Sequence, residues 1–171
     1  MKKYVDAFDY AGTICKAMPK GILLTTKRGD EVNTMTIGWG TIGIEWGKPV
    51  FVAYVRDSRH TRKLLDETGE FTVNIPLKDV DRNIISVCGT KSGRDLDKIG
   101  ALGLTLEPGD EVDVPGIREL PLTLECKVLF RNVQDESRLP EPIRGRFYTG
   151  GNYADYHIAY YGEILGAYIA E

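Results

Sequence analysis

Residues 120–130 carry the pattern that most constrains this sequence, because apolar side chains occupy every second position of the segment. The alternate positions are Leu120, Leu122, Leu124, Cys126, Val128 and Phe130, and the intervening ones include Thr123, Glu125 and Lys127. A period of two places successive side chains on opposite faces of a β-strand. We therefore expect a long strand with the first set of side chains in the core and the second set mostly facing solvent.

Glycine, proline, aspartate and asparagine divide the rest of the sequence into short segments, as these residues do at turns. The pattern predicts further strands over residues 21–26, 32–44, 50–55, 71–75, 104–106 and 157–170. A length of 171 residues corresponds to one domain. We therefore expect a single domain over residues 1–171, which forms a mostly-β barrel with peripheral helices.

Helices are expected between these strands. Ser58 is the expected N-cap of the first helix, because a serine hydroxyl can accept a hydrogen bond from a free backbone N–H, and Gly69 is its expected C-cap. Apolar residues at helical spacing predict a second helix over residues 79–88, and a shorter one covers residues 95–102. Residues 137–151 contain several prolines and glycines, so we expect a long loop there.

Charge and hydrophobicity exclude several classes of protein. The formal net charge is −3 and basic residues form no cluster, so general nucleic-acid binding lacks its electrostatic driving force. The longest apolar run covers residues 50–55, whereas a helix that crosses a bilayer needs about 20 apolar residues. No apolar segment of the kind found in secretory leaders follows Met1. We therefore expect no contact with membranes.

The cysteines and histidines are too scattered to indicate a metal site. Cys15, Cys88 and Cys126 form an odd and widely spaced set, and His60 and His157 lie far apart in the sequence. Zinc and iron–sulfur sites need clustered ligands, and a disulfide framework needs paired cysteines. We expect reduced thiols, no metal and a cytoplasmic location.

Two early stretches contain candidate binding residues. Residues 33–43 alternate glycines and small polar residues around Trp39, so a flat ring could lie against their backbone; a twisted edge strand would need the same glycines. Residues 56–63 place Ser58, Arg59 and Thr61 at an expected helix start, where free N–H groups and the helix dipole favour a phosphate. A capped surface helix with a solvated basic face explains that pattern equally well.

Two later stretches are weaker candidates. Residues 88–95 form a loop rich in glycine and serine, in which Lys91 could meet an anion, although a flexible loop would look similar. His157 lies among aromatic residues at the start of the last strand, where a histidine is more often structural than catalytic. His60 is flanked by Arg59 and lies near Arg62, which favours a place on the helix surface.

The order and spacing of these stretches resemble the flavin reductase family with the FMN-binding split-barrel fold, including its flavoredoxin-like members. The residues that carry the resemblance are Asn33-x-Met35-Thr36-Ile37-Gly38-Trp39, Ser58-Arg59-His60-Thr61, Phe71-Thr72-Val73-Asn74-Ile75-Pro76, Cys88-Gly89-Thr90-Lys91-Ser92-Gly93 with Asp97-Lys98, Glu125-Cys126-Lys127, and His157 with Gly162-Glu163. The likeness runs over residues 17–170. It implies a non-covalently bound FMN, a homodimer, and hydride transfer from NADH or NADPH to the flavin.

The resemblance also assigns a role to each candidate residue. Asn33, Met35, Thr36 and Trp39 would lie along the flavin ring and its side chain, Ser58, Arg59 and Thr61 would hold the phosphate, Lys91 would reach the flavin from its loop, and His157 would orient the nicotinamide. A cation near the flavin stabilises the reduced anion, which is one way a protein tunes such a cofactor.

One departure from the family pattern leaves the electron donor open. Gly38-Trp39-Gly40 stands where many short reductases have a serine-containing segment, and this feature is closer to flavoredoxins. The first hypothesis is therefore an NAD(P)H-dependent FMN reductase. The alternatives are an electron carrier that exchanges electrons with a redox protein partner, and a barrel that binds a small ligand without redox chemistry.

Overall fold

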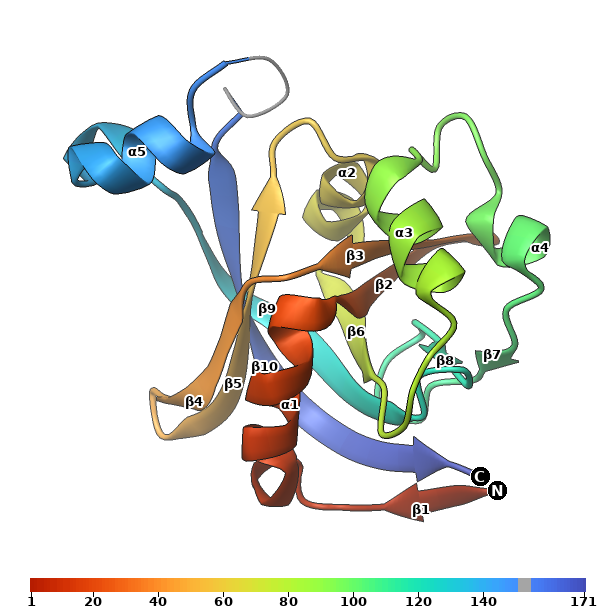
Figure 1. Ribbon diagram of the computed structural model, residues 1–171. Coiled ribbons are helices and arrows are strands. Elements are labelled where there is room, and N and C mark those ends of the chain that lie inside the picture. Colours follow the sequence, from red (N-terminus) through yellow and green to blue (C-terminus); the bar gives the residue numbers. More distant parts are fainter. Residues whose placement is uncertain (151–154) are drawn as a thin grey trace.

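One curved antiparallel sheet forms the centre of the fold (Figure 1). The computed structural model describes residues 1–150 and 155–171. Within these residues the strands follow the order β3-β2-β6-β9-β10-β5-β4, and β1 pairs with β10 beside this path. Their bounds are β1 (Lys2–Tyr4), β2 (Ile22–Arg28), β3 (Glu31–Ile37), β4 (Gly40–Glu45), β5 (Lys48–Arg56), β6 (Glu70–Ile75), β9 (Leu122–Val133) and β10 (His157–Ala170). The expected mostly-β architecture with peripheral helices is confirmed.

The remaining elements surround this sheet. The α-helices are α1 (Ala11–Ala17), α2 (His60–Thr68), α3 (Arg82–Thr90), α4 (Lys98–Leu102) and α5 (Glu141–Phe147). Short 3-10 helices cover Ala7–Tyr10, Met18–Lys20 and Glu136–Arg138. A second, two-stranded sheet joins β7 (Leu106–Glu107) to β8 (Gly116–Ile117), so the weak strand expected over residues 104–106 is reduced to β7.

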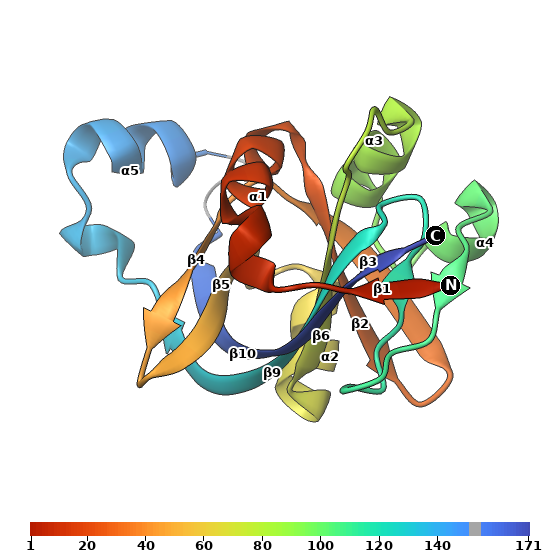
Figure 2. The ribbon, with the colours of Figure 1, turned by 90° about the horizontal axis from the view of Figure 1, so that it is seen from below.

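Helix α1 fills the open side of the curved sheet. Figure 2 shows β4 and β5 on one side of α1 and β2 and β3 on the other. Ile14 of α1 and the adjacent Met18 are buried in the main core with Phe51, Phe71 and Tyr160. Ile14 is the one buried side chain of α1, so the helix leaves no periodic signal in the sequence. This explains why the sequence pattern does not predict it.

The prediction of one extended strand over residues 32–44 is wrong. The segment forms two strands, β3 and β4, which lie at opposite ends of the sheet. β3 pairs with β2, whereas β4 pairs with β5, and the chain crosses between them at Gly38 and Trp39. Gly40 begins β4 directly against β5, where a Cβ atom would lie 2.8 Å from the Phe51 ring. The glycines therefore serve a close crossing, which a single extended strand would not need.

The long strand at residues 120–130 is confirmed as β9, but its two faces differ from the expectation. Thr123 and Glu125 are buried rather than solvent-facing, because the segment before β8 covers them. Glu125 Oε1 accepts a hydrogen bond from the backbone N–H of Asp110 at 2.7 Å. Phe130, expected in the core, is 48% exposed. A period of two shows that a strand alternates, but it does not show what covers each face.

The helices begin later than the sequence predicts. Arg59, not Ser58, is the N-cap of α2, whereas the C-cap at Gly69 is confirmed by its left-handed φ of 66°. The N-cap of α3 is Asp81, whose side chain accepts a hydrogen bond from the N–H of Asn83. The long loop expected over residues 137–151 contains α5, which tolerates Pro142 in its first turn.

The described helices are all too short or too polar to cross a membrane.

Candidate functional site

A cavity of about 490 Å³ lies between β3, the start of α2 and the loop that follows α3. A smaller hollow of about 160 Å³ adjoins it, since both are lined by Met35, Arg56 and Arg59. Six of the sequence-predicted residues line the larger cavity, namely Asn33, Met35, Ser58, Arg59, Thr61 and Lys91. The others, Thr36, Trp39 and His157, line the smaller hollow. The structure therefore brings all the predicted residues to one groove.

Hydrogen bonds fix the wall that β3 and α2 form together. Thr61, in the first turn of α2, is buried, and its hydroxyl accepts a hydrogen bond from Asn33 Nδ2 at 2.8 Å. Thr36 donates its own hydroxyl to the carbonyl of Ile85 in α3 at 2.7 Å. The first contact holds the start of α2 against β3, and the second holds α3 against β3. A ligand in the cavity would meet a preformed wall.

The loop after α3 closes the cavity from the other side. At Gly93 a Cβ atom would lie 2.2 Å from Oδ1 of Asn33 and 2.9 Å from Cδ2 of His60. Glycine therefore lets the loop backbone lie directly on these two side chains. His60, expected on the helix surface, is mostly buried under this loop, and its Nε2 lies 2.6 Å from Glu31 Oε1. The prediction that His60 lies on the helix surface, which was based on the neighbouring arginines, is therefore wrong.

Ser58 faces a carboxylate of the same chain. Asp155 accepts hydrogen bonds from both the backbone N–H of Ser58, at 3.1 Å, and the Ser58 hydroxyl. The Ser58 hydroxyl is therefore turned toward the residue just before β10 and does not cap α2. Its role as a phosphate ligand remains a prediction.

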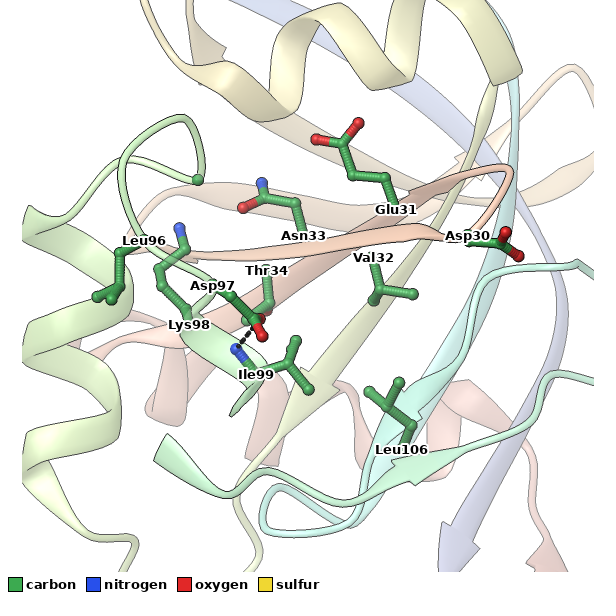
Figure 3. A pocket seen from close by; sticks show the side chains of 11 residues that line it. Asp30, Glu31, Val32, Asn33, Thr34, Leu96, Asp97, Lys98, Ile99 and Leu106 are labelled. Atoms are coloured by element: carbon green, nitrogen blue, oxygen red, sulfur yellow. Dashed lines mark hydrogen bonds between the residues drawn. The ribbon is translucent and has the colours of Figure 1, made fainter. Parts of the chain in front are cut away.

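Lys98 is a further site residue that the sequence reasoning did not assign. Its side chain is 4% exposed, and its Nζ donates to the carbonyl of Lys91 at 3.2 Å, whereas Lys91 itself is exposed. Lys98 also lines a second pocket of about 360 Å³ between β3 and α4, and Figure 3 shows its tip beside the amide of Asn33. Its sequence signals are its place after Asp97, the N-cap of α4, and the Asp97-Lys98 pair among the residues that carry the family resemblance.

The larger cavity is strongly cationic. Its cationic lining residues are Arg56, Arg59, Lys91, Arg94 and Lys98, and no carboxylate is among the described residues that line it. Burial lowers the pKa of Arg59, and the neighbouring Arg56 lowers it further. Burial also lowers the pKa of Lys98, and Arg59 adds to this effect, although Cys88 opposes it. Asp155, outside the cavity lining, raises the pKa of Arg59 in part. A doubly charged anion in the cavity would stabilise the charged forms of Arg59 and Lys98 further.

The smaller hollow adds aromatic rings to the two arginines, Arg56 and Arg59, that it shares with the larger cavity. The Trp39 ring, 39% exposed, lies 4.9 Å from the His157 ring and 5.0 Å from the Phe147 ring. His157 is buried, and burial, followed by the charge of Arg56, lowers its pKa to about 4. The imidazole is therefore neutral near pH 7. Its Nδ1 lies 2.8 Å from the hydroxyl of Tyr148.

The two parts of the groove together fit a molecule with a flat ring and a phosphate, such as FMN. The cations beside the start of α2 suit the phosphate. The adjoining hollow offers Met35 and the Trp39 ring as apolar contacts. Among the described residues, no group of three or more histidine, cysteine, aspartate and glutamate side chains could hold a metal ion.

Comparison with known families decides the assignment of the chain. The family described as flavin reductase like domain matches residues 16–171. The chain belongs to this family. An uncharacterized protein of Pyrococcus abyssi is 31% identical over 106 residues, which are 62% of this chain and 59% of that protein. The chain thus spans less than two thirds of the length of this relative.

Solved structures share the fold of this flavin reductase like domain. Flavoredoxin of Desulfovibrio vulgaris (Miyazaki F) matches with a TM-score of 0.65 and 24% identity, over 88% of this chain and 69% of that one. An NADH:FAD oxidoreductase of Streptomyces globisporus matches with a TM-score of 0.62 and 16% identity, over 88% of this chain and 75% of that one. At these identities the likeness shows the fold, and the predicted FMN-binding split barrel is confirmed at that level.

Proposed function

We propose that this chain binds FMN non-covalently in the groove between β3 and α2. The observation that carries the proposal is the larger cavity, in which Lys98 is buried, Arg59 is partly buried, and no carboxylate is among the described residues of the lining. Arg59 and the first turn of α2 would hold the phosphate with Lys98, while Lys91 and Arg94 would screen it from solvent. Asn33, Met35 and Thr36 would line the ring and its ribityl chain.

We further propose that the chain is an oxidoreductase that uses NADH or NADPH. When bound, FMN supplies a ring that accepts a hydride and passes the electrons to an acceptor. The chain's own residues position the reactants: Trp39 excludes water from one side of the hollow, and neutral His157 orients the nicotinamide. Because the pKa of His157 is about 4, this side chain serves as a hydrogen-bonding group near pH 7 and not as an acid.

A second candidate function is an electron carrier that exchanges electrons with a redox protein and meets nicotinamide poorly. Two features favour it: the fold match to a flavoredoxin, and the Gly38-Trp39-Gly40 crossing. Stopped-flow mixing of the FMN-loaded protein with NADH or NADPH separates the two functions. Rapid loss of the oxidised flavin absorbance supports the reductase, and its persistence supports the carrier.

The FMN site is tested by titrating the purified protein with FMN and with riboflavin, which lacks the phosphate, and following flavin fluorescence. Arg59→Gln is expected to weaken FMN binding by roughly tenfold or more, because a charge-assisted hydrogen bond contributes about 1.5–3 kcal/mol. Riboflavin binding should change little. Lys63→Gln is the matched control, since Lys63 is an exposed cation of the same helix. Equal FMN affinity in all three proteins would exclude this phosphate site.

We also propose a homodimer, based on an aromatic cluster on the outer face of the sheet. Trp46 and Phe130 are 56% and 48% exposed, and the Phe130 ring packs 5.3 Å from that of Tyr161. Contiguous exposed aromatic side chains are typical of surfaces that are covered in an assembly. A second copy of the chain would cover them. In sedimentation experiments, Phe130→Glu should yield monomers, whereas Ile143→Glu on α5 should not; a monomeric wild type would contradict the proposal.

A further inference from the structure

A chain of hydrogen bonds leads from the end of β9 to the imidazole of His157. The backbone N–H of Gln134 donates to the carbonyl of His157 at 3.0 Å, so the two residues are held side by side. The hydroxyl of Tyr148, at the C-cap of α5, lies 3.2 Å from Gln134 Oε1 and 2.8 Å from His157 Nδ1. Tyr148 therefore bridges an amide oxygen and the histidine ring.

The number of protons available to these hydrogen bonds determines which ring nitrogen of His157 carries a proton. An amide oxygen can only accept, and a tyrosine hydroxyl has a single proton to donate. If Tyr148 donates that proton to Gln134 Oε1, it can only accept at its other contact. His157 Nδ1 must then carry a proton and donate it to Tyr148. A neutral imidazole with a proton on Nδ1 has none on Nε2.

We propose that Tyr148 and Gln134 act as positioning residues that hold neutral His157 with its proton on Nδ1, so that Nε2 accepts a hydrogen bond from an amide N–H of the second substrate. The identity of that substrate rests on the proposed function, whereas the tautomer does not. No hydrogen-bond partner of Nε2 occurs among the described residues, and His157 lines the hollow with Trp39.

The surroundings of His157 keep it in the neutral form that this arrangement requires. The charged groups that act on the ring are Arg56 and Arg59, which oppose a positive charge, and Asp155, which favours one; burial adds to the effect of the arginines. The other neighbours, Tyr148 and Trp39, carry no charge near neutral pH. The ring thus presents an acceptor to the hollow throughout the range around pH 7.

An acceptor at Nε2 selects for the chemical class of the substrate. The carboxamide of a reduced nicotinamide carries an N–H₂ group that can donate to Nε2. The acid analogue, reduced nicotinic acid adenine dinucleotide, has a carboxylate there, which cannot donate and would face the lone pair of Nε2. A site that is built for one donor rejects an analogue that lacks it. The opposite tautomer would favour the acid over the amide.

Nitrogen-15 NMR of the ligand-free protein at pH 7 tests the tautomer directly, with the signals of His157 identified by their absence from His157→Gln. We expect the wild type to carry the proton on Nδ1. Tyr148→Phe keeps the ring but removes the hydroxyl, so it should give a mixture of tautomers, whereas Tyr54→Phe, at another tyrosine of the same hollow, should not. Gln134→Glu keeps an acceptor oxygen and should preserve the wild-type tautomer.

A proton on Nε2 in the wild type, or an unchanged tautomer in Tyr148→Phe, would overturn the proposal. Substrate selection is measured in the FMN-loaded protein as the ratio of kcat/KM for the amide and acid dinucleotides. We expect the amide to be preferred at least tenfold, and Tyr148→Phe to reduce that preference with unchanged FMN affinity. If neither dinucleotide reduces the flavin, the proposed reductase function fails, while the NMR result still decides the tautomer.

Discussion

The two ends of the groove differ in the side chains that line them. The end at Arg59 and Lys98 concentrates positive charge, and no carboxylate is among the described residues that line it. The end at Trp39 and His157 adds aromatic rings, and burial together with Arg56 keeps the imidazole of His157 neutral. The first end can supply binding energy for an anion, and the second can orient a neutral group. The difference indicates that affinity and reactivity are controlled by separate sets of side chains.

The largest expected effect concerns the neutral end and is a dependence of stability on pH. The pKa of His157 is lowered to about 4 in the folded protein, whereas an unfolded histidine titrates near 6.5. Between pH 4 and 6.5 the histidine is protonated in the unfolded chain but neutral in the folded one. The free energy of unfolding therefore falls as the pH drops from about 6.5 to 4. The contribution is at most about 3.5 kcal/mol, since one pKa unit corresponds to about 1.4 kcal/mol.

Denaturant unfolding at several pH values measures this effect. The difference between the wild type and His157→Gln isolates it, because the carboxylates titrate in both proteins. The stability of the wild type relative to His157→Gln should rise as the pH increases from about 4 to 6.5 and stay constant above pH 6.5. Parallel curves would show that the ring is not held neutral, and the contrast between the two ends would then be lost.

A smaller effect is expected at the charged end, where Lys98→Met should separate binding from stability. Loss of the ammonium should weaken FMN binding by roughly 10- to 100-fold, because it removes a charged donor worth about 1.5–3 kcal/mol. The ligand-free protein should melt at about the same temperature, because removing a buried cation that lacks a carboxylate partner relieves a desolvation cost. Fluorescence titration and thermal melting measure the two quantities.

Riboflavin provides the control for Lys98→Met. Its affinity should be nearly unchanged, since it carries no phosphate. If Lys98→Met weakened riboflavin and FMN binding equally, Lys98 would belong to the ring-binding part of the groove, and the division between its ends would need to be redrawn.

The smallest expected effect comes from Asp155, which lies between the two ends. Its carboxylate accepts from the backbone N–H and the hydroxyl of Ser58, and it also acts on the charges of Arg59 and His157. Asp155→Asn should strengthen FMN binding a few-fold, because a negative charge leaves the neighbourhood of the phosphate, an effect of about 1 kcal/mol or less. Weaker binding would mean that Asp155 supports the site by holding Ser58 in place.

The sequence predicted the charged end better than the aromatic end, for a physical reason. Arg59 and Thr61 lie within one short segment whose helix-start pattern is local, so a reading of nearby residues suffices. Lys98 belongs to the same end but contributes through burial, which depends on how α4 packs on β3. Residue type and spacing do not reveal that packing, and Lys91, the more obvious lysine of the loop, turned out to be exposed.

At the aromatic end only part of the arrangement can be predicted from the sequence. His157 and Trp39 were predicted from the family pattern, but Tyr148 and Gln134 were not. Tyr148 follows α5, in a segment whose prolines and glycines predict a loop, and Gln134 reaches His157 only because β9 and β10 pair. Contacts of this kind depend on strand register and on the docking of a short helix, neither of which leaves a periodic pattern.

The placement of β3 and β4 at the two margins of one sheet has a thermodynamic consequence. The hollow at Trp39 is lined by β3 and by β5, the neighbour of β4, so an occupant touches strands from both margins. No backbone hydrogen bonds join these margins within the described sheet order. A molecule bound there would link strands that no backbone hydrogen bonds join, and its release would make it easier for these strands to separate. Occupancy and melting temperature should therefore rise together, by mass action.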